Sequence, residues 1–248
     1  TPWDISISKY SADGSVLEYA TYLGGERNEY PHSLIVNEAE ELIVFGTSQS
    51  VNYPTTPTAY NTDINGSVDI VVTKFSADGS SLIGSTYVGG ASSDGLNSQN
   101  DMNSYYADEY RGEVNLDAAE NILIGSCTYY LDSPTTNSAY QRLSNGAQEG
   151  VVFSLNSDLS SLLWSTYFGG IASESVYGID LTQDGNLVIS GGTTSPDLPT
   201  QDNAYQKEYQ GGSVDGYVLK MSPDGSSILA CTYFGTEDYD QVLASEGD

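Results

Sequence analysis

The chain has 248 residues and a formal net charge of −27, because 34 Asp and Glu outnumber 7 Lys and Arg. So few cations cannot neutralise a run of phosphates, which argues against nucleic acid and against an anionic membrane surface as partners. The 20 Tyr and 26 Gly favour short strands and turns over helices, and no apolar run approaches the length of a membrane span, so we expect no direct membrane insertion.

A recurring hairpin organises the chain. Its first copy occupies residues 1–25, with the turn Ser11-Ala12-Asp13-Gly14 between two strands and Thr21-Tyr22 near its end. The Thr of this pair recurs at intervals of 65, 80 and 66 residues, at Thr86, Thr166 and Thr232. The chain is therefore a tandem array of one structural unit with a single insertion.

Asp-Gly sequences form the turn of this hairpin. The second copy has Asp78-Gly79 between its strands and Tyr87 at its end, and we assign structural roles to these three residues. The third copy has Asp158-Leu159 in place of Asp-Gly. This replacement predicts a different turn in the third copy.

A second hairpin alternates with the first, around residues 34–46, 114–125 and 179–191. The alternation gives four strands in each period of about 65 residues. Each second hairpin is followed by a segment that contains Pro-Thr and ends in Ala-Tyr, at Tyr60, Tyr140 and Tyr205. The constant offset predicts that each ring fills the same pocket of its own unit, a structural role.

The 80-residue interval carries its extra residues at 91–112. Because an insertion in a repeat array must leave from a loop, we expect this segment to decorate one face of the array and to contact a partner. Its tyrosines, which could stack on sugar rings or fill a partner's groove, are Tyr105, Tyr106 and Tyr110. Its candidate calcium ligands are Asp94, Asp101 and Asp108, which match no EF-hand or nonapeptide spacing. Solvated loop residues that pack on their own unit are the alternative interpretation.

Four-stranded units in tandem, with no helical pattern between them, predict an all-β, β-propeller-type array of antiparallel blades. One hairpin cannot bury both of its faces, so neighbouring copies must pack on one another. The chain holds about three and a half blades in a single repeat domain, 1–248. We place the half blade at 1–25, the blades at 33–90, 113–170 and 176–235, and the start of an unfinished blade at 236–248. A solenoid of stacked sheets is the alternative architecture.

Three of the four lysines, Lys9, Lys74 and Lys220, share one repeat position. Their recurrence in so acidic a chain predicts a partly buried ion pair repeated in each blade, which is an architectural role. Cys127 and Cys231 occupy different repeat positions, so we expect two buried free thiols rather than a disulfide or a zinc site.

Several motifs together resemble the bacterial β-propeller repeat family called SBBP. They are the sequences at 69–80 and 85–90, the Asp-Gly-Asn-Leu-Val-Ile-Ser-Gly-Gly-Thr-Thr-Ser run at 184–195, and Pro-Thr-Thr-Pro-Thr-Ala-Tyr at 54–60. The resemblance covers nearly the whole chain. It implies an extracellular or cell-surface bacterial protein and part of a larger one, of the kind that gliding bacteria export by type IX secretion.

We therefore expect a non-enzymatic interaction or structural module that binds a protein or glycan partner, or another domain of a larger surface complex, through a blade face or the 91–112 insertion. Calcium is the one cofactor considered. We predict no catalytic residue, because His32 is the only histidine, no Gly-x-Ser-x-Gly motif accompanies it, and a surface or capping role suits it. A propeller-type glycoside hydrolase or lyase, and a passive spacer in a surface fibre, are the alternatives.

Overall fold

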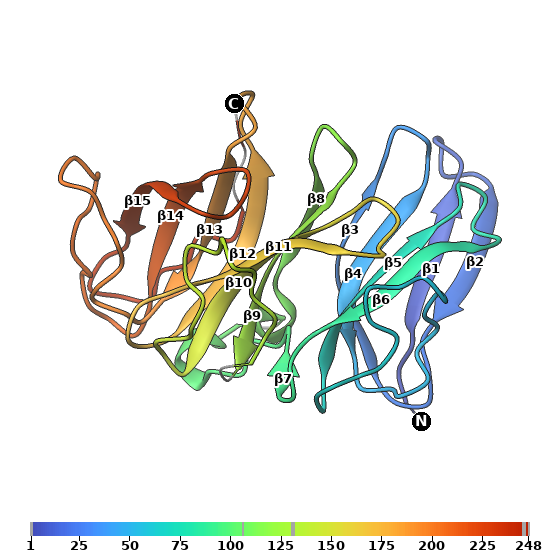
Figure 1. Ribbon diagram of the computed structural model, residues 1–248, viewed down its shortest axis with the longest axis horizontal. Coiled ribbons are helices and arrows are strands. Elements are labelled where there is room, and N and C mark those ends of the chain that lie inside the picture. The colour runs from blue at the N-terminus through green and yellow to red at the C-terminus, as the bar shows by residue number, and fades with distance from the viewer. Residues whose placement is uncertain (1, 106, 130–131, 245–246, 248) are drawn as a thin grey trace.

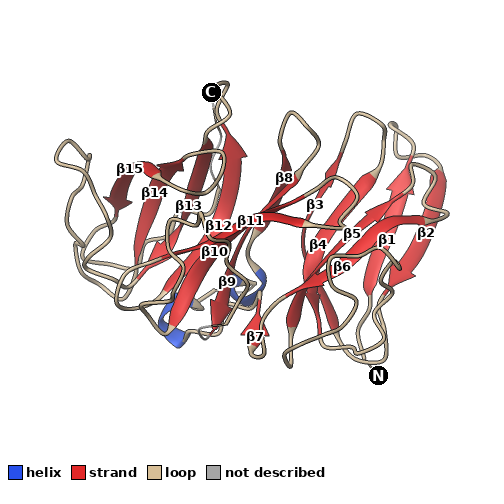
Figure 2. Ribbon diagram, viewed as in Figure 1, coloured by secondary structure: helices blue, strands red, loops and turns tan. Residues whose placement is uncertain are grey.

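Strands dominate the computed structural model, which describes residues 2–105, 107–129, 132–244 and 247. Its described helices are two single 3-10 turns, η1 (Asn100–Met102) and η2 (Asp108–Tyr110), shown in blue in Figure 2. The all-β prediction is therefore confirmed. Within the described ranges, no helix has the length and apolar character that crossing a membrane requires.

The chain forms a two-stranded hairpin and then three larger antiparallel sheets. The N-terminal hairpin consists of β1 (Ile5–Tyr10) and β2 (Leu17–Leu23). The first sheet has the order β3-β4-β5-β6, with strands Glu29–Val36, Leu42–Ser48, Asp69–Phe75 and Leu82–Val88. The third sheet has the order β12-β13-β14-β15, with strands Glu174–Leu181, Leu187–Thr193, Asp215–Met221 and Ile228–Phe234.

The second sheet differs because the insertion interrupts its first strand. The two pieces β7 (Ser93–Asp94) and β8 (Glu113–Leu116) both pair with β9 (Ile122–Tyr129), which pairs in turn with β10 (Gln148–Leu155) and then β11 (Leu162–Phe168). Each expected blade therefore starts too far along the chain. Strand pairing begins at Glu29, Ser93 and Glu174, ahead of the expected starts at 33, 113 and 176. The extra residues lie inside a strand instead of in a loop before it.

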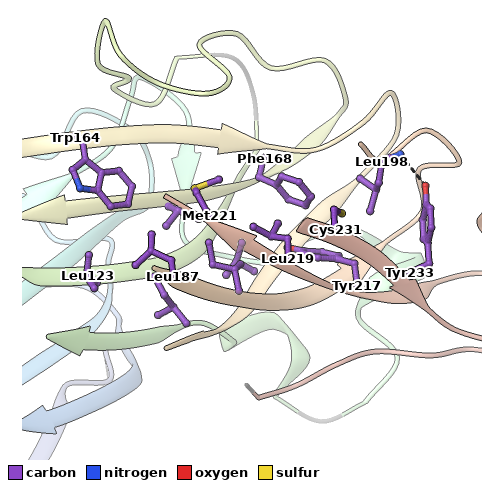
Figure 3. Packing of buried hydrophobic residues seen from close by; sticks show 14 residues of the cluster. Leu123, Trp164, Phe168, Leu187, Leu198, Tyr217, Leu219, Met221, Cys231 and Tyr233 are labelled. Carbon is purple, nitrogen blue, oxygen red and sulfur yellow. Dashed lines mark hydrogen bonds between the residues drawn. The ribbon is translucent and has the colours of Figure 1, made fainter. Parts of the chain in front are cut away.

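The hairpin and the sheets follow one another along an arc in chain order, from the hairpin at the right of Figure 1 to the third sheet at the left. The first strands lie close together, since β8 contacts both β3 and β12. Neighbouring sheets share their interiors: Ile5 of β1 packs in one cluster with Val71 of β5, and Phe45 of β4 packs in another with Phe153 of β10. Figure 3 shows the third cluster, which joins the second and third sheets. Each copy thus buries its apolar face against the next.

One tyrosine of each sheet anchors the loop that follows the sheet's second strand. Tyr87, Tyr167 and Tyr233 are fully buried, and their hydroxyls donate to the main-chain oxygens of Ser50, Ser133 and Ser195. The equivalent Tyr22 of the hairpin is 77% exposed. The structural role predicted for Tyr87 is confirmed, and the comparison with Tyr22 shows that it requires the first two strands of a complete sheet.

The turn between the last two strands of each unit, which we call the outer turn, has the same shape in all four copies. These turns are Ser11–Val16, Ser76–Ser81, Asn156–Ser161 and Ser222–Ser227. Leu159 has a φ of +62° and its N–H donates to Asn156 O, as the N–H of Gly79 (φ +67°) donates to Ser76 O. The different turn predicted for the third copy is therefore wrong. The left-handed conformation costs leucine about 1–2 kcal/mol. Complete burial of its side chain, which contributes about 1.5–3 kcal/mol, offsets that cost.

The lysine prediction is confirmed in part. The lysines form ion pairs, with Nζ–carboxylate distances of 3.1 Å for Lys9–Glu40, 2.6 Å for Lys74–Glu41 and 3.5 Å for Lys220–Asp184, but only the Lys74 side chain is buried and the second sheet has Ser154 at this position. The prediction for the cysteines is confirmed. The two cysteines are buried free thiols.

The Ala-Tyr segments differ from their prediction, because the rings of Tyr60 and Tyr140 are only partly buried and Tyr205 is 84% exposed. Main-chain atoms make the repeated contact instead: Tyr60 N donates to Leu159 O, and Tyr140 N to Gly225 O.

Candidate functional site

The insertion is a packed part of the second sheet. Asp108 is buried, and its carboxylate accepts hydrogen bonds from Tyr105 N at 2.8 Å and from Arg111 Nε at 2.8 Å. Asn97 is also buried and donates to the main-chain oxygens of Met102 and Asp108. These contacts hold both 3-10 turns together, and Gln148 of β10 donates to Asn97 Oδ1 at 2.9 Å, so the insertion presents a defined surface on the second sheet.

The three acidic residues predicted as calcium ligands have separate environments. Asp94 is buried at the end of β7 and accepts from Gly90 N and Ser133 Oγ. Asp108 pairs with Arg111, and Asp101 is exposed. In the described part of the chain, no group of three or more His, Cys, Asp or Glu side chains has a metal-binding arrangement. The two buried carboxylates therefore stabilise turns.

The insertion lies at a position where the other two first strands also leave regular pairing. β3 has a β-bulge between Pro31 and Ser33, and β12 has one between Val176 and Gly178. In the pairing register, the insertion between Asp94 and Glu113 occupies the corresponding place in the second sheet. A bulge redirects a side chain out of the ladder, and here the bulged residues are His32 and Tyr177.

These three irregular positions converge on one pocket of about 530 Å³, which we call the aromatic pocket. Its principal side chains are Trp3, Tyr30, His32, Tyr110, Arg111 and Tyr177. The rings of Tyr30 and Tyr110 stack with centroids 4.6 Å apart, and Trp3 meets Tyr30 edge-on at 6.1 Å. Trp3 is 65% exposed, so its ring is accessible at the rim.

His32 forms part of the wall of this pocket. Its ring lies 4.9 Å from the ring of Phe45, and Nε2 is 3.4 Å from Thr47 Oγ1. Burial lowers the pKa of His32 to about 3, because the surrounding apolar groups disfavour the charged imidazolium. The side chain is therefore neutral at physiological pH. The bulge turns the ring toward Phe45, yet the side chain is only partly buried, so the surface or capping role expected for it stays a prediction.

The ionisable groups of the aromatic pocket already have protein partners. The Arg111 guanidinium pairs with Asp108, with Nη2–Oδ1 at 2.7 Å, and its Cζ lies 5.8 Å from the centre of the Tyr177 ring. Glu113 accepts a hydrogen bond from Ile179 N at 2.9 Å, and burial raises the pKa of its carboxyl. The pocket therefore offers aromatic faces and neutral hydrogen-bonding groups more than free charge.

The three tyrosines predicted to contact a ligand do not lie together in the described structure. Tyr110 lines the aromatic pocket, whereas Tyr105 is 64% exposed and packs edge-on against Tyr239 at 5.5 Å. Tyr106 lies outside the described residues. Trp3 was not predicted as a site residue. Its main-chain oxygen accepts from Glu29 N as Val68 O accepts from Asp94 N, so Trp3 and Val68 occupy one repeat position and differ in the size of the side chain.

Buried carboxylates also meet in pairs at the boundaries between units. In the clearest case Glu149 and Glu174 lie on either side of Gly169, where an added Cβ would be 2.2 Å from an oxygen of each. Glu149 caps the N–H groups of Asn145 and Gly146, and Glu174 caps that of Gly170. Desolvation raises the pKa of Glu174 to about 7, and the charge of Glu149 adds to the shift.

No protein-family model matches the chain, and no curated protein matches its sequence. Among solved structures, the chain is similar to the crystal structure of BamB from Moraxella catarrhalis, with 11% sequence identity and a TM-score of 0.22. That likeness covers 93% of this chain and 71% of the BamB chain. The resemblance to the SBBP repeats stays a prediction.

Proposed function

We propose that the chain is a non-enzymatic glycan-binding module of a secreted bacterial cell-surface protein, with the aromatic pocket as its binding site. In this proposal the four-stranded sheets are blades of an SBBP-type β-propeller array, and the pocket lies where their first strands converge. The observation that carries the proposal is the group formed by Trp3, Tyr30 and Tyr110, which joins the N-terminal segment, the first sheet and the insertion.

The chemistry of the pocket suits a neutral sugar. Aromatic faces bury the apolar C–H face of a sugar ring, and the Tyr30 hydroxyl can bond its hydroxyl groups. An anionic ligand is disfavoured because the chain carries a net charge of −27 and the Arg111 guanidinium is already paired with Asp108. We therefore favour a neutral glycan over a polyanionic one.

Binding is favoured over catalysis by the state of the carboxylates near the pocket. A glycosidase needs one free acid and one free base on opposite sides of the scissile bond. Asp108 is buried in an ion pair, and Glu113 accepts a main-chain N–H. Both carboxylates thus have partners that hold them away from such a role.

The test is a titration of the chain with a panel of neutral and anionic oligosaccharides, followed by Trp emission and calorimetry. Trp3→Ala and Tyr110→Ala should each weaken binding by about tenfold or more, because each removes one aromatic face. Tyr10→Ala is the matched control, since Tyr10 is 56% exposed but lies at the far end of β1. Repeating the titration with EDTA tests whether calcium takes part. Equal effects of all three substitutions, or binding of anionic glycans alone, would contradict the proposal.

Point substitutions are preferable to deletion of the insertion. Residues 92–110 include the buried side chains of Asn97 and Met102, and Gln148 of β10 donates to Asn97 Oδ1 at 2.9 Å. Deletion would therefore disturb the second sheet as well as the pocket, and loss of binding would have two explanations.

A further inference from the structure

The outer turn of each of the three larger sheets packs on the unit that precedes it in the chain. The turn at Gly79 lies against the ring of Tyr19 in β2, and the turn at Gly225 lies against the ring of Trp164 in β11. The turn at Leu159 lies against Gly84 of β6, where an added Cβ would be 2.6 Å from Asp158 O. Tyr19, Gly84 and Trp164 occupy one repeat position, two residues before the Thr-Tyr pair.

Two polar contacts accompany this packing. The Ala-Tyr segment of the preceding sheet donates a main-chain N–H to the tip of the turn, at 2.8 Å for Tyr60 N to Leu159 O and 3.0 Å for Tyr140 N to Gly225 O. The lysine of the repeat reaches a turn carbonyl, as Lys74 Nζ does at 3.4 Å from Ser157 O. The Leu159 turn receives all three groups: a repeat position two residues before Thr-Tyr, one N–H and one ammonium group. The Gly79 turn has the ring of Tyr19 and the ammonium of Lys9, and the Gly225 turn has the ring of Trp164 and the N–H of Tyr140.

The third sheet presents the same three groups on an exposed surface. Ala230, Tyr205 and Lys220 are the equivalent residues, and all three line one shallow pocket of about 350 Å³. We call them the turn-binding surface. Among the described residues, Tyr205 N has no hydrogen-bond acceptor, in contrast to Tyr60 N and Tyr140 N.

The N-terminal hairpin carries the complementary element. Its outer turn, Ser11–Val16, has the internal hydrogen bonds of the other copies, yet an added Cβ at Gly14 would meet no atom within 4 Å. The turn is anionic, because hydrogen bonds from Ser11 and Ser15 lower the pKa of Asp13 to about 2. This charge suits the ammonium group of Lys220.

We propose that the turn-binding surface of one molecule binds the outer turn Ser11–Val16 of a second copy, in a head-to-tail interface. The hairpin and the third sheet lie at opposite ends of the arc in Figure 1, so the outer turn of one molecule cannot reach the turn-binding surface of the same molecule. Such an interface is heterologous and leaves a free surface and a free turn at the ends of every oligomer.

The segment after β15 supports this occupant. Asp240 N donates to Val214 O at 2.8 Å, as Asp94 N donates to Val68 O at the start of the second sheet. The segment thus makes the main-chain contact that a first strand makes, beside the surface where the second copy's hairpin would supply the last two strands of a further unit.

The test is sedimentation velocity of the full chain between about 1 µM and 1 mM. The wild-type mass should rise with concentration above the 26.5 kDa of one chain. Ala230→Glu places a carboxylate against the anionic turn and should weaken association by about tenfold or more. Leu229→Glu is the matched control, because its repeat counterparts Ile83 and Leu163 are exposed beside occupied surfaces and Glu18 stands naturally at this position.

A mixing experiment tests the head-to-tail geometry. Gly14→Glu alters the turn without forbidding its conformation, since Glu40 and Glu120 adopt φ values of +60° and +62° in this chain. Neither Gly14→Glu nor Ala230→Glu should associate alone, whereas their mixture should give a dimer and no larger species. Circular dichroism checks that both variants are folded. A wild-type chain that stays monomeric at the highest concentration, equal effects of Ala230→Glu and Leu229→Glu, or no dimer on mixing would overturn the proposal.

Discussion

The tyrosine that ends each repeat permits a graded test of how the units are stabilised. In the third sheet, the Tyr233 hydroxyl donates to Ser195 O at 2.9 Å and accepts from Leu198 N at 2.8 Å, and Figure 3 shows the second of these bonds. Tyr233→Phe removes both bonds and leaves two buried main-chain groups without that partner. Because each such group costs about 1–3 kcal/mol, we expect a loss of about 2–4 kcal/mol in the free energy of unfolding.

Two other copies supply the comparison. Among the described residues, the Tyr167 hydroxyl makes one bond, to Ser133 O at 3.1 Å, so Tyr167→Phe should cost about 1–2 kcal/mol. Tyr22 is 77% exposed, so Tyr22→Phe should change stability by less than about 0.5 kcal/mol.

The assay is urea unfolding followed by the emission of Trp164, which is 9% exposed and lies in the same cluster as Tyr233. Circular dichroism provides a second probe, because a repeat array can unfold in more than one step. A Tyr22→Phe variant as unstable as Tyr233→Phe, or a cost of less than about 0.5 kcal/mol for Tyr233→Phe, would refute the reasoning.

Three further outcomes are expected. The pKa of Glu174 is raised to about 7 from its usual 4.5. Its contribution of about 3 kcal/mol to the free energy of unfolding is therefore fully present below pH 4.5 and is lost as the pH rises through 7. Urea unfolding should show a more stable chain at pH 5 than at pH 8, with a smaller difference in Glu174→Gln. Gly79→Ala should cost about 2 kcal/mol because its Cβ would lie 2.7 Å from a ring of β2, whereas Gly14→Ala meets only its positive φ and should cost about 1 kcal/mol; thermal unfolding of the two variants measures the difference. Lys74→Met should cost about 2 kcal/mol by leaving the Glu41 carboxylate without its cation, and a double-mutant cycle with Glu41→Gln should recover at least half of that loss.

Much of the fold is predictable because the repeat compares the sequence with itself. Residues such as Tyr87 and Lys74 recur at a constant distance from Asp-Gly turns, and recurrence identifies them as parts of the unit. Leu159 is an exception. Local turn chemistry disfavours leucine at positive φ, so the sequence predicts a different turn where the structure keeps the same one. The neighbouring sheet that buries its side chain is not visible in the local sequence.

The site was harder to predict because its residues are far apart in the sequence. Tyr110 could be singled out as part of an insertion, but Tyr30 and Tyr177 lie in ordinary strands. Their positions in the pocket depend on bulges, which no composition or periodicity in those strands signals. Trp3 is the exception, since comparison with Val68 would have marked it as larger than the repeat requires.

The interrupted first strand of the second sheet shows that the insertion does not alter the pairing of the other strands. The pairing of β10 with β9 and β11 follows the same register as the pairing of β5 with β4 and β6, despite the extra residues upstream. Segment length and composition at this place can therefore diverge while the interlocking of the repeats is preserved. The bulges at His32 and Tyr177 are two equivalent grafting points, where new loops could be introduced to alter selectivity without redesigning the framework.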